Sequence, residues 1–113
     1  MATTSTPVRL LIVGMNAEMN SKITAGLNDD KSISAHGFIV SNDSKSDAEL
    51  INVIKEKKHD VIILGGGLRS QEGWLERIDS IVKENTDVHV LEINGRTVDA
   101  VKEALHVNGI LKG

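Results

Sequence analysis

The sequence contains no cysteine among its 113 residues. Disulfides, iron–sulfur clusters, thiolate zinc sites and cysteine nucleophiles are therefore excluded. Its only aromatic residues are Phe38 and Trp74, so it lacks the stacking platform on which proteins bind single-stranded bases. No apolar run approaches the ~20 residues of a membrane-spanning helix. Residues 1–7 lack the features of a secretory signal, so we expect a cytoplasmic protein that does not bind membranes.

Positive charge is sparse as well. The formal net charge is −3, and no basic stripe of the kind found on nucleic-acid-binding domains is visible. The one basic cluster, residues 55–58 (KEKK), falls at the end of an expected helix, where lysines interact favourably with the helix dipole. We therefore expect no nucleic-acid partner.

What the sequence does contain is a regular alternation of strand-like and helix-like segments. Residues 1–7 are small and polar and are expected to form a disordered lead-in, whereas residues 8–113 have the size of a single domain. Apolar, β-branched runs predict four strands, with a short fifth strand or an ordered tail at the end of the chain. The strands are expected at 8–14, 32–40, 60–64 and 87–93, and the fifth at 108–113.

A helix pattern follows each of the first four strands. The starts are marked by Asn16 as an N-cap, by the capping box of Ser46 and Glu49, by Ser70, and by the turn at residues 94–97. The apolar residues recur at helical spacing and should face the sheet: Met19, Ile23 and Leu27; Leu50, Ile51, Val53 and Ile54; Leu75, Ile78, Ile81 and Val82; Val98, Val101 and Leu105. This pattern predicts a flavodoxin-like or receiver-like α/β sandwich of three layers, with a parallel sheet of four or five strands and helices on both faces.

The expected functional site lies at the carboxyl ends of the strands, where open α/β sheets bind their ligands. The residues that should converge there include one carboxylate and no histidine. They are Gly14, Met15 and Asn16 after the first strand, Gly65, Gly66 and Gly67 after the third, and Glu92, Ile93 and Asn94 at the end of the fourth.

The triple glycine has two interpretations. Its backbone N–H groups could cradle a small anion or a nucleotide phosphate, helped by Asn16 and Arg69. The other residues that could take part in such a site are Gly14, Met15, Glu92 and Lys112. Alternatively, the glycines permit a tight turn and a close approach of the backbone. The segment lacks the spacing of a P-loop or a dinucleotide-binding fingerprint. A ligand at Gly65–Gly67 would favour the first interpretation, and a dry cleft filled by Met15 and Ile93 the second.

The other polar candidates favour structural roles. Glu92 could act as a general base, but no second acid is in view, so a salt bridge with Lys112 or exposure to solvent is expected. The four histidines show no metal-ligand spacing; His59 falls at a helix end, and His89 is expected to be a half-buried strand residue. Trp74 could lie in an interface or partly in the core. We therefore expect no metal, no cofactor and no catalytic residue.

Several strings of the chain resemble the receiver domain of two-component response regulators. RLLIVGMN and HDVIILGGG are similar to the family's first and third strands, VHVLEI to its fourth, and DAVKEAL…NGILKG to its last stretch. The resemblance covers residues 8–113. It implies the receiver scaffold and a role in signal transduction.

The chemistry of that family does not carry over residue by residue. In that family the first strand ends in an acidic pair, the third in the phosphoacceptor aspartate and the fourth in a Thr or Ser. The corresponding residues here are Gly14 and Met15, Gly65, and Glu92. Only Lys112 matches the family's lysine. Because Mg²⁺ needs oxygen ligands and phosphoryl transfer needs a nucleophile, the resemblance implies a pseudo-receiver.

We therefore expect a non-catalytic signalling or scaffold module that acts through protein–protein contacts and is not phosphorylated. A receiver-like order would place the second, third and fourth helices on one face of the sheet and the first helix alone on the other. The face with one helix would then be partly bare and apolar, which favours a homodimer or docking on another signalling protein. Alternatively, residues 107–112 fold back over it.

Overall fold

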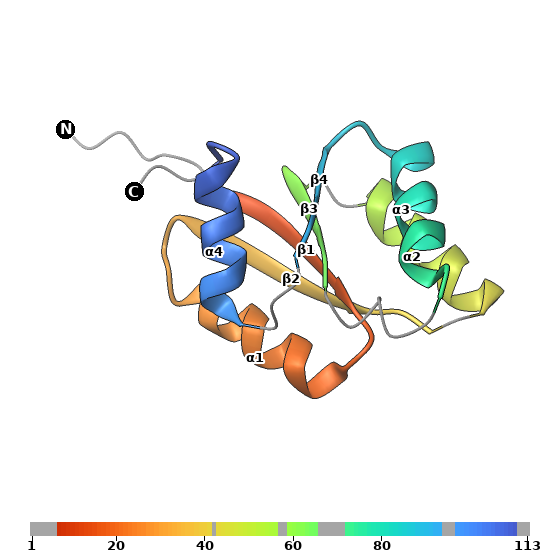
Figure 1. The fold of residues 1–113 in the computed structure, drawn as a ribbon, viewed down its shortest axis with the longest axis horizontal. Coiled ribbons are helices and arrows are strands. Elements are labelled where there is room, and N and C mark those ends of the chain that lie inside the picture. The colour runs from red at the N-terminus through yellow and green to blue at the C-terminus, as the bar shows by residue number, and fades with distance from the viewer. Residues whose placement is uncertain (1–6, 42, 57–58, 66–71, 94–96, 111–113) are drawn as a thin grey trace.

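The computed structural model describes residues 7–41, 43–56, 59–65, 72–93 and 97–110. It confirms an α/β fold in which helices cover both faces of a parallel sheet (Figure 1). The elements, in chain order, are β1 (Val8–Gly14), α1 (Ala17–Asn28), β2 (Ile33–Ile39), α2 (Ser44–Glu56), β3 (Val61–Leu64), α3 (Trp74–Asn85), β4 (His89–Glu92) and α4 (Val98–Val107).

The sheet has the order β2-β1-β3-β4, and every neighbouring pair is parallel. The two central strands are apolar on both faces, because each face is covered by helices. Residues 10–13 of β1 and 61–64 of β3 are all buried. The more polar β2 is an edge strand, as its composition suggests, and β4 forms the other edge. This is the flavodoxin-like arrangement expected from the sequence.

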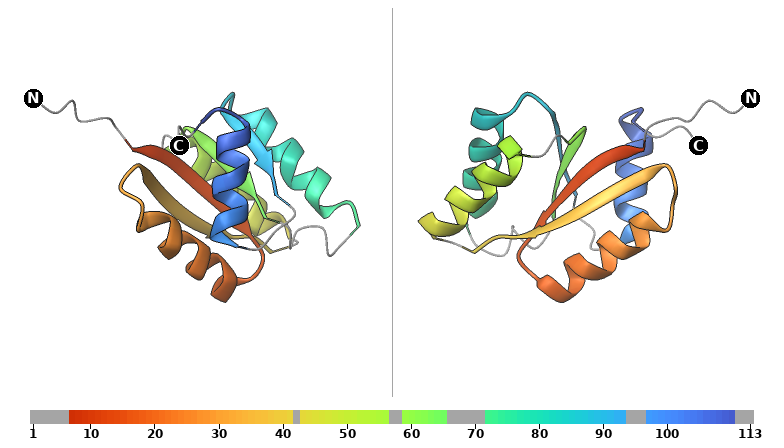
Figure 2. Two further views of the ribbon diagram at one scale, coloured as in Figure 1. Left: turned by 60° about the vertical axis from the view of Figure 1, so that its left-hand side comes forward. Right: turned by 180° about the vertical axis from the view of Figure 1, so that it is seen from behind.

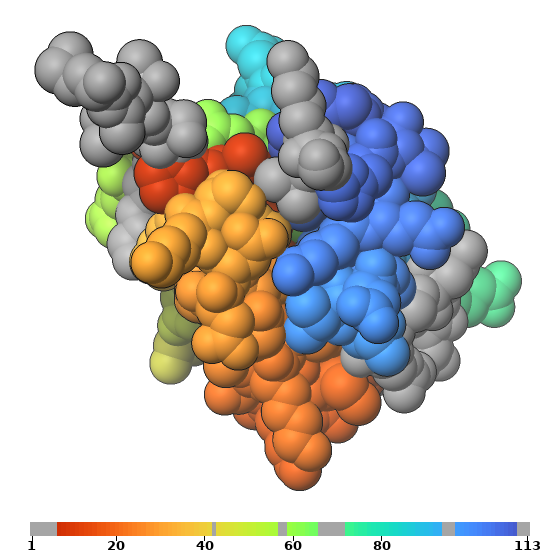
Figure 3. All heavy atoms as spheres, turned by 90° about the vertical axis from the view of Figure 1, so that its left-hand side faces the viewer, coloured from red at the N-terminus to blue at the C-terminus, as the bar shows by residue number. Residues whose placement is uncertain are grey.

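The four helices of the described residues divide two and two between the faces of the sheet (Figure 2). On one face, α1 and α4 bury Ile23, Leu27, Val101 and Leu105 against the sheet. They lie against each other on the surface of this side (Figure 3). On the other face, α2 and α3 bury Leu50, Ile54, Trp74, Leu75, Ile78 and Val82. Arg77 of α3 forms an ion pair with Asp47 of α2.

The expected grouping of the second to fourth helices on one face is therefore wrong. A right-handed crossover from β4 to a further strand beyond it would place α4 beside α3. Instead α4 crosses to the face of α1, where Val101 and Leu105 pack in the same cluster as Leu91 and Ile93. Each face is consequently covered by two of the described helices, so the described residues leave no face with a single helix, on which the homodimer expectation rested. The homodimer itself stays a prediction.

The expected fifth strand is not found in the described part of the chain. Residues 108–110 form a turn after α4, in which the N–H of Ile110 donates to the carbonyl of Leu105 at 2.8 Å. Ile110 packs against the core beneath α1 and α4. Because α4 lies on the face of α1, a strand that followed it and paired with β4 would need a left-handed crossover. Residues 111–113 lie outside the described residues.

Of the predicted helix starts, the N-cap at Asn16 is confirmed, whereas the start predicted at Ser46 is not. Asn16 caps α1, since its Oδ1 accepts from the N–H of Met19 at 2.9 Å. The helix α2 begins before Ser46, and the carboxylate of Asp43 accepts from the N–H of Ser46 at 2.7 Å. The predicted capping box is therefore wrong, because the Ser46 hydroxyl accepts from the N–H of Ser41 instead. Ser70 lies outside the described residues.

Candidate functional site

The carboxyl ends of β1, β3 and β4 meet as the sequence predicts. Val13 is in register with Leu64, and Leu64 with Glu92. Two backbone hydrogen bonds continue the sheet beyond the last paired residues. The N–H of Gly65 donates to the carbonyl of Val13 at 2.8 Å, and the N–H of Ile93 donates to Leu64 at 3.1 Å.

Gly65 lies at a close approach between two strand ends. A Cβ at this position would be 3.2 Å from the carbonyl oxygen of Val13 and 3.8 Å from the Cα of Gly14. The first distance is tighter than side chains normally tolerate, and the Val13 carbonyl is backbone that cannot turn away. The Gly65 N–H already donates to Val13, so it is not available to an anion. At Gly65 the structure therefore supports the packing interpretation of the glycines.

Four of the anion-binding candidates, Gly66, Gly67, Arg69 and Lys112, lie outside the described residues, and so does Asn94. The two candidates after β1 are both exposed. The Asn16 side-chain oxygen is used as the helix cap, and Met15 is 38% exposed rather than filling a cleft. Ile93, in contrast, is 5% exposed and belongs to the core below α4.

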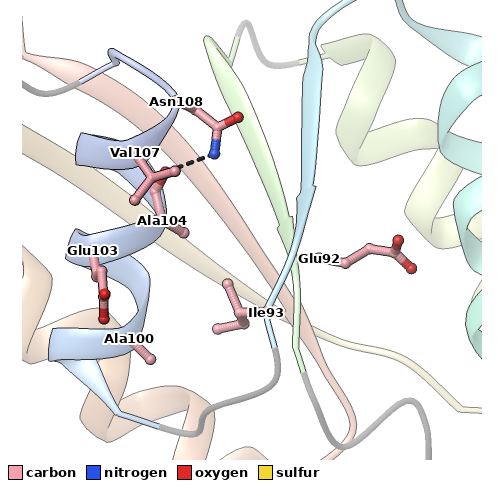
Figure 4. A pocket seen from close by; sticks show the side chains of 7 residues that line it. All are labelled: Glu92, Ile93, Ala100, Glu103, Ala104, Val107 and Asn108. Atoms are coloured by element: carbon pink, nitrogen blue, oxygen red, sulfur yellow. Dashed lines mark hydrogen bonds between the residues drawn. The ribbon is translucent and has the colours of Figure 1, made fainter.

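Glu92 is exposed at the end of β4. Successive side chains of a strand point to opposite faces, and Figure 4 shows this plainly: Ile93 points toward α4, whereas the carboxylate of Glu92 points away from it, toward the α3 side. The expected exposure of Glu92 is confirmed. Its pairing with Lys112 stays a prediction, because Lys112 lies outside the described residues.

A shallow groove of about 370 Å³ lies between the end of β4 and α4 (Figure 4). Its lining is mostly small and apolar. Glu103 of α4 is an acidic lining residue, whereas Glu92 lines the groove with its carboxylate pointing away from α4. The lining residues are Glu92, Ile93, Ala100, Glu103, Ala104, Val107 and Asn108. Sequence reasoning missed this groove. The signal was present in the spacing of Ala100, Ala104 and Val107, which places small or exposed apolar residues along one side of the helix.

One histidine differs from the sequence expectation, and a second shows a burial that was not predicted. His89 is exposed rather than half-buried, and His59 is buried, with its ring edge-on to that of His36 at a centroid distance of 6.1 Å. Within the described ranges, no three histidine, aspartate or glutamate residues are placed to hold a metal ion. Trp74 is 4% exposed and is thus a core residue.

No protein-family profile matches the chain, and no curated protein matches it. Of the helices in the described residues, none combines the length and the apolar character needed to cross a membrane. The functional argument consequently rests on the geometry of the strand ends and on the groove beside β4.

Proposed function

We propose that this chain is a non-catalytic, receiver-like signalling or scaffold module that acts through protein–protein contacts and is not phosphorylated. The observation that carries the proposal is the packing of Gly65. In the receiver resemblance this residue occupies the phosphoacceptor position, yet its Cβ would lie 3.2 Å from the carbonyl of Val13. The position therefore offers neither a nucleophile nor easy space for one.

The chemistry of the neighbouring positions supports the same proposal. Receivers hold Mg²⁺ with carboxylates because a hard cation prefers oxygen ligands, and the transferred phosphoryl group needs that charge neutralised. The corresponding residues here are Gly14 and Met15, which bring no carboxylate to the end of β1. Among the described residues at these strand ends, the single carboxylate is that of Glu92, and it points toward the α3 side of the sheet.

The test is treatment of the intact protein with acetyl phosphate and Mg²⁺, followed by mass spectrometry. A receiver domain that retains its phosphoacceptor aspartate is the positive control. We expect the control to gain one phosphoryl group, about 80 Da, and this protein to keep its mass. A stoichiometric, acid-labile gain of that size on this protein would overturn the proposal.

Anion binding at the glycine segment is the competing function, and a second measurement addresses it. Inorganic phosphate and ATP are titrated into ¹⁵N-labelled protein, and the backbone amide signals are followed. We expect no saturable shifts at Gly65 because its N–H donates to Val13. Saturable shifts confined to residues 65–69 and Asn16 would favour a small-ligand-binding domain instead.

A further inference from the structure

The outer edge of β4 is open in the described part of the chain. The strand lies at the end of the sheet and pairs with β3 alone. Ile93 directs its N–H to β3, and alternate residues of a strand direct their backbone groups to the same side. Val90 and Glu92 therefore direct their N–H and C=O groups outward, where an added strand would find its hydrogen-bonding partners.

The groove beside this edge provides room for the side chains of such a strand. Ala100 and Ala104 are small, so α4 leaves about 370 Å³ open next to Ile93. Val107, at the end of the same helix, is 77% exposed. An apolar side chain from an added strand would cover these three residues of α4, and Glu103 would lie at the rim of the groove.

We propose that the β4 edge and the groove bind an extended segment of a partner protein, which adds a strand to the sheet and carries alternating apolar and basic residues. Side chains of an added strand alternate between the faces of the sheet. Those on the α4 side meet Ile93, Ala100 and Ala104, whereas those on the other side meet the carboxylate of Glu92. The inference rests on the proposed function, because it names the kind of partner that the module would bind.

Charge distinguishes this partner from a second copy of the chain. Neither edge strand of the protein contains lysine or arginine, since β4 is HVLE and β2 is ISAHGFI. Two β4 strands paired antiparallel about Leu91 would place both Glu92 carboxylates on the same face of the joined sheet, with no basic residue between them. The two carboxylates would be diagonal neighbours rather than directly opposite, and two negative charges at that separation still repel each other. Each copy also carries a net charge of −3.

The experiment measures binding of fluorescein-labelled peptides to the full chain by fluorescence anisotropy. The probe has the core Val-Lys-Val-Lys-Val, and the matched control peptide has Val-Glu-Val-Glu-Val. We expect saturable binding of the lysine peptide only. Glu92→Lys should weaken it by about tenfold or more and should raise the affinity for the glutamate peptide. The matched protein control is Glu49→Lys on the exposed side of α2, which should change neither affinity appreciably.

Two further variants test the strand geometry. Ala104→Leu should weaken binding of the lysine peptide because leucine fills the groove. Two further peptides are N-methylated at every second backbone nitrogen, one at the odd positions and the other at the even positions. Each of them loses the hydrogen-bond donors of one edge only. One of the two methylated peptides should therefore lose binding and the other keep it. Circular dichroism of each protein variant shows whether the fold is retained.

Three outcomes would overturn the inference. The first is no peptide binding up to millimolar concentration, and the second is equal weakening by Glu92→Lys and Glu49→Lys. The third is a homodimer in sedimentation that Ala104→Leu dissociates, because a second copy would then occupy the edge. None of these outcomes tests whether the protein is phosphorylated. A phosphoryl adduct would overturn the proposed function but would not change the result of the peptide-binding experiment.

Discussion

Asn28 closes the outer edge of β2 by pairing its side-chain amide with both backbone groups of Ala35. Its Oδ1 accepts from the Ala35 N–H at 2.7 Å, and its Nδ2 donates to the Ala35 carbonyl at 3.0 Å. The amide thus takes the place of one peptide unit of a neighbouring strand. Open strand edges invite pairing with other chains, so β2 is protected at this point by its own preceding helix. Among the described residues, no side chain closes the outer edge of β4 in this way.

Replacing Asn28 should destabilise the fold. The Asn28→Ala variant leaves two part-buried backbone groups without their partner, which we expect to cost about 1–3 kcal/mol. Urea unfolding measures the loss. The matched control is Asn52→Ala on the exposed side of α2, which should change the free energy of unfolding by less than about 0.5 kcal/mol. Equal effects of the two substitutions would show that the Asn28 pairing contributes nothing.

The contact between α1 and α4 predicts a coupled pair of substitutions. A Cβ at Gly26 would lie 2.4 Å from Cγ2 of Val98. Gly26→Ala should therefore destabilise the protein by about 1–3 kcal/mol, since either the Val98 side chain must leave its position or the two helices must move apart. In the background of Val98→Ala the same substitution should cost less, with a coupling energy of about 0.5–3 kcal/mol in a double-mutant cycle. Purely additive effects would contradict the placement of α4 beside α1.

Trp74 serves as both a core residue and a fluorescent probe. It is the only tryptophan, and among the described residues its buried Nε1 has no hydrogen-bond partner. We expect native emission at shorter wavelength than in the unfolded protein, and a cost of about 3–5 kcal/mol for Trp74→Ala.

Trp74→Phe should cost less than half as much as Trp74→Ala, because it keeps most of the apolar ring and removes an unsatisfied donor. Denaturant unfolding followed by far-ultraviolet circular dichroism compares the two variants without relying on tryptophan emission. If Trp74→Phe were as destabilising as Trp74→Ala, the Nε1 group would have a stabilising role that the structure does not show.

The ion pair between Arg9 and Asp60 predicts a small acid-dependent loss of stability. Hydrogen bonds from the Arg9 side chain and backbone, which are the main causes, hold the pKa of Asp60 below its ordinary value of 3.8. Because the folded-state pKa is lowered, the stabilisation is present above the unfolded pKa and is lost as pH falls through the folded pKa. Both side chains are more than a third exposed, so the pair contributes at most about 1 kcal/mol.

The measurement compares unfolding of the parent protein and Asp60→Asn between neutral pH and strongly acidic pH. We expect the parent to be more stable at pH 7 and the difference to shrink as pH falls below 3.8. Glu49→Gln on the exposed side of α2 is the control. A difference that stayed constant through the acidic range would show that the Asp60 charge is not responsible.

The sequence by itself determined the succession of strands and helices. An apolar residue recurs every four positions at Met19, Ile23 and Leu27. A helix with such a face buries it against whatever it packs on. Ile23 and Leu27 are indeed in the core. The continuous apolar run at 61–64 required burial on both faces, hence a central parallel strand. Asn16 could be recognised as a cap because its role depends only on the residues that directly follow it.

Only the tertiary structure decided which face of the sheet each helix covers and where the chain leaves an edge open. The apolar stripe of α4 fits either face, because β4 presents Val90 on one side and Leu91 on the other. Helical periodicity states which side of a helix is buried but not what buries it. The groove beside β4 and the closure of β2 by Asn28 arise between elements that are brought together only when the chain folds. The spacing of Ala100, Ala104 and Val107 marks one side of α4, but it does not state that the end of β4 lies beside that side. Nothing in the sequence around Asn28 states that its amide pairs with Ala35.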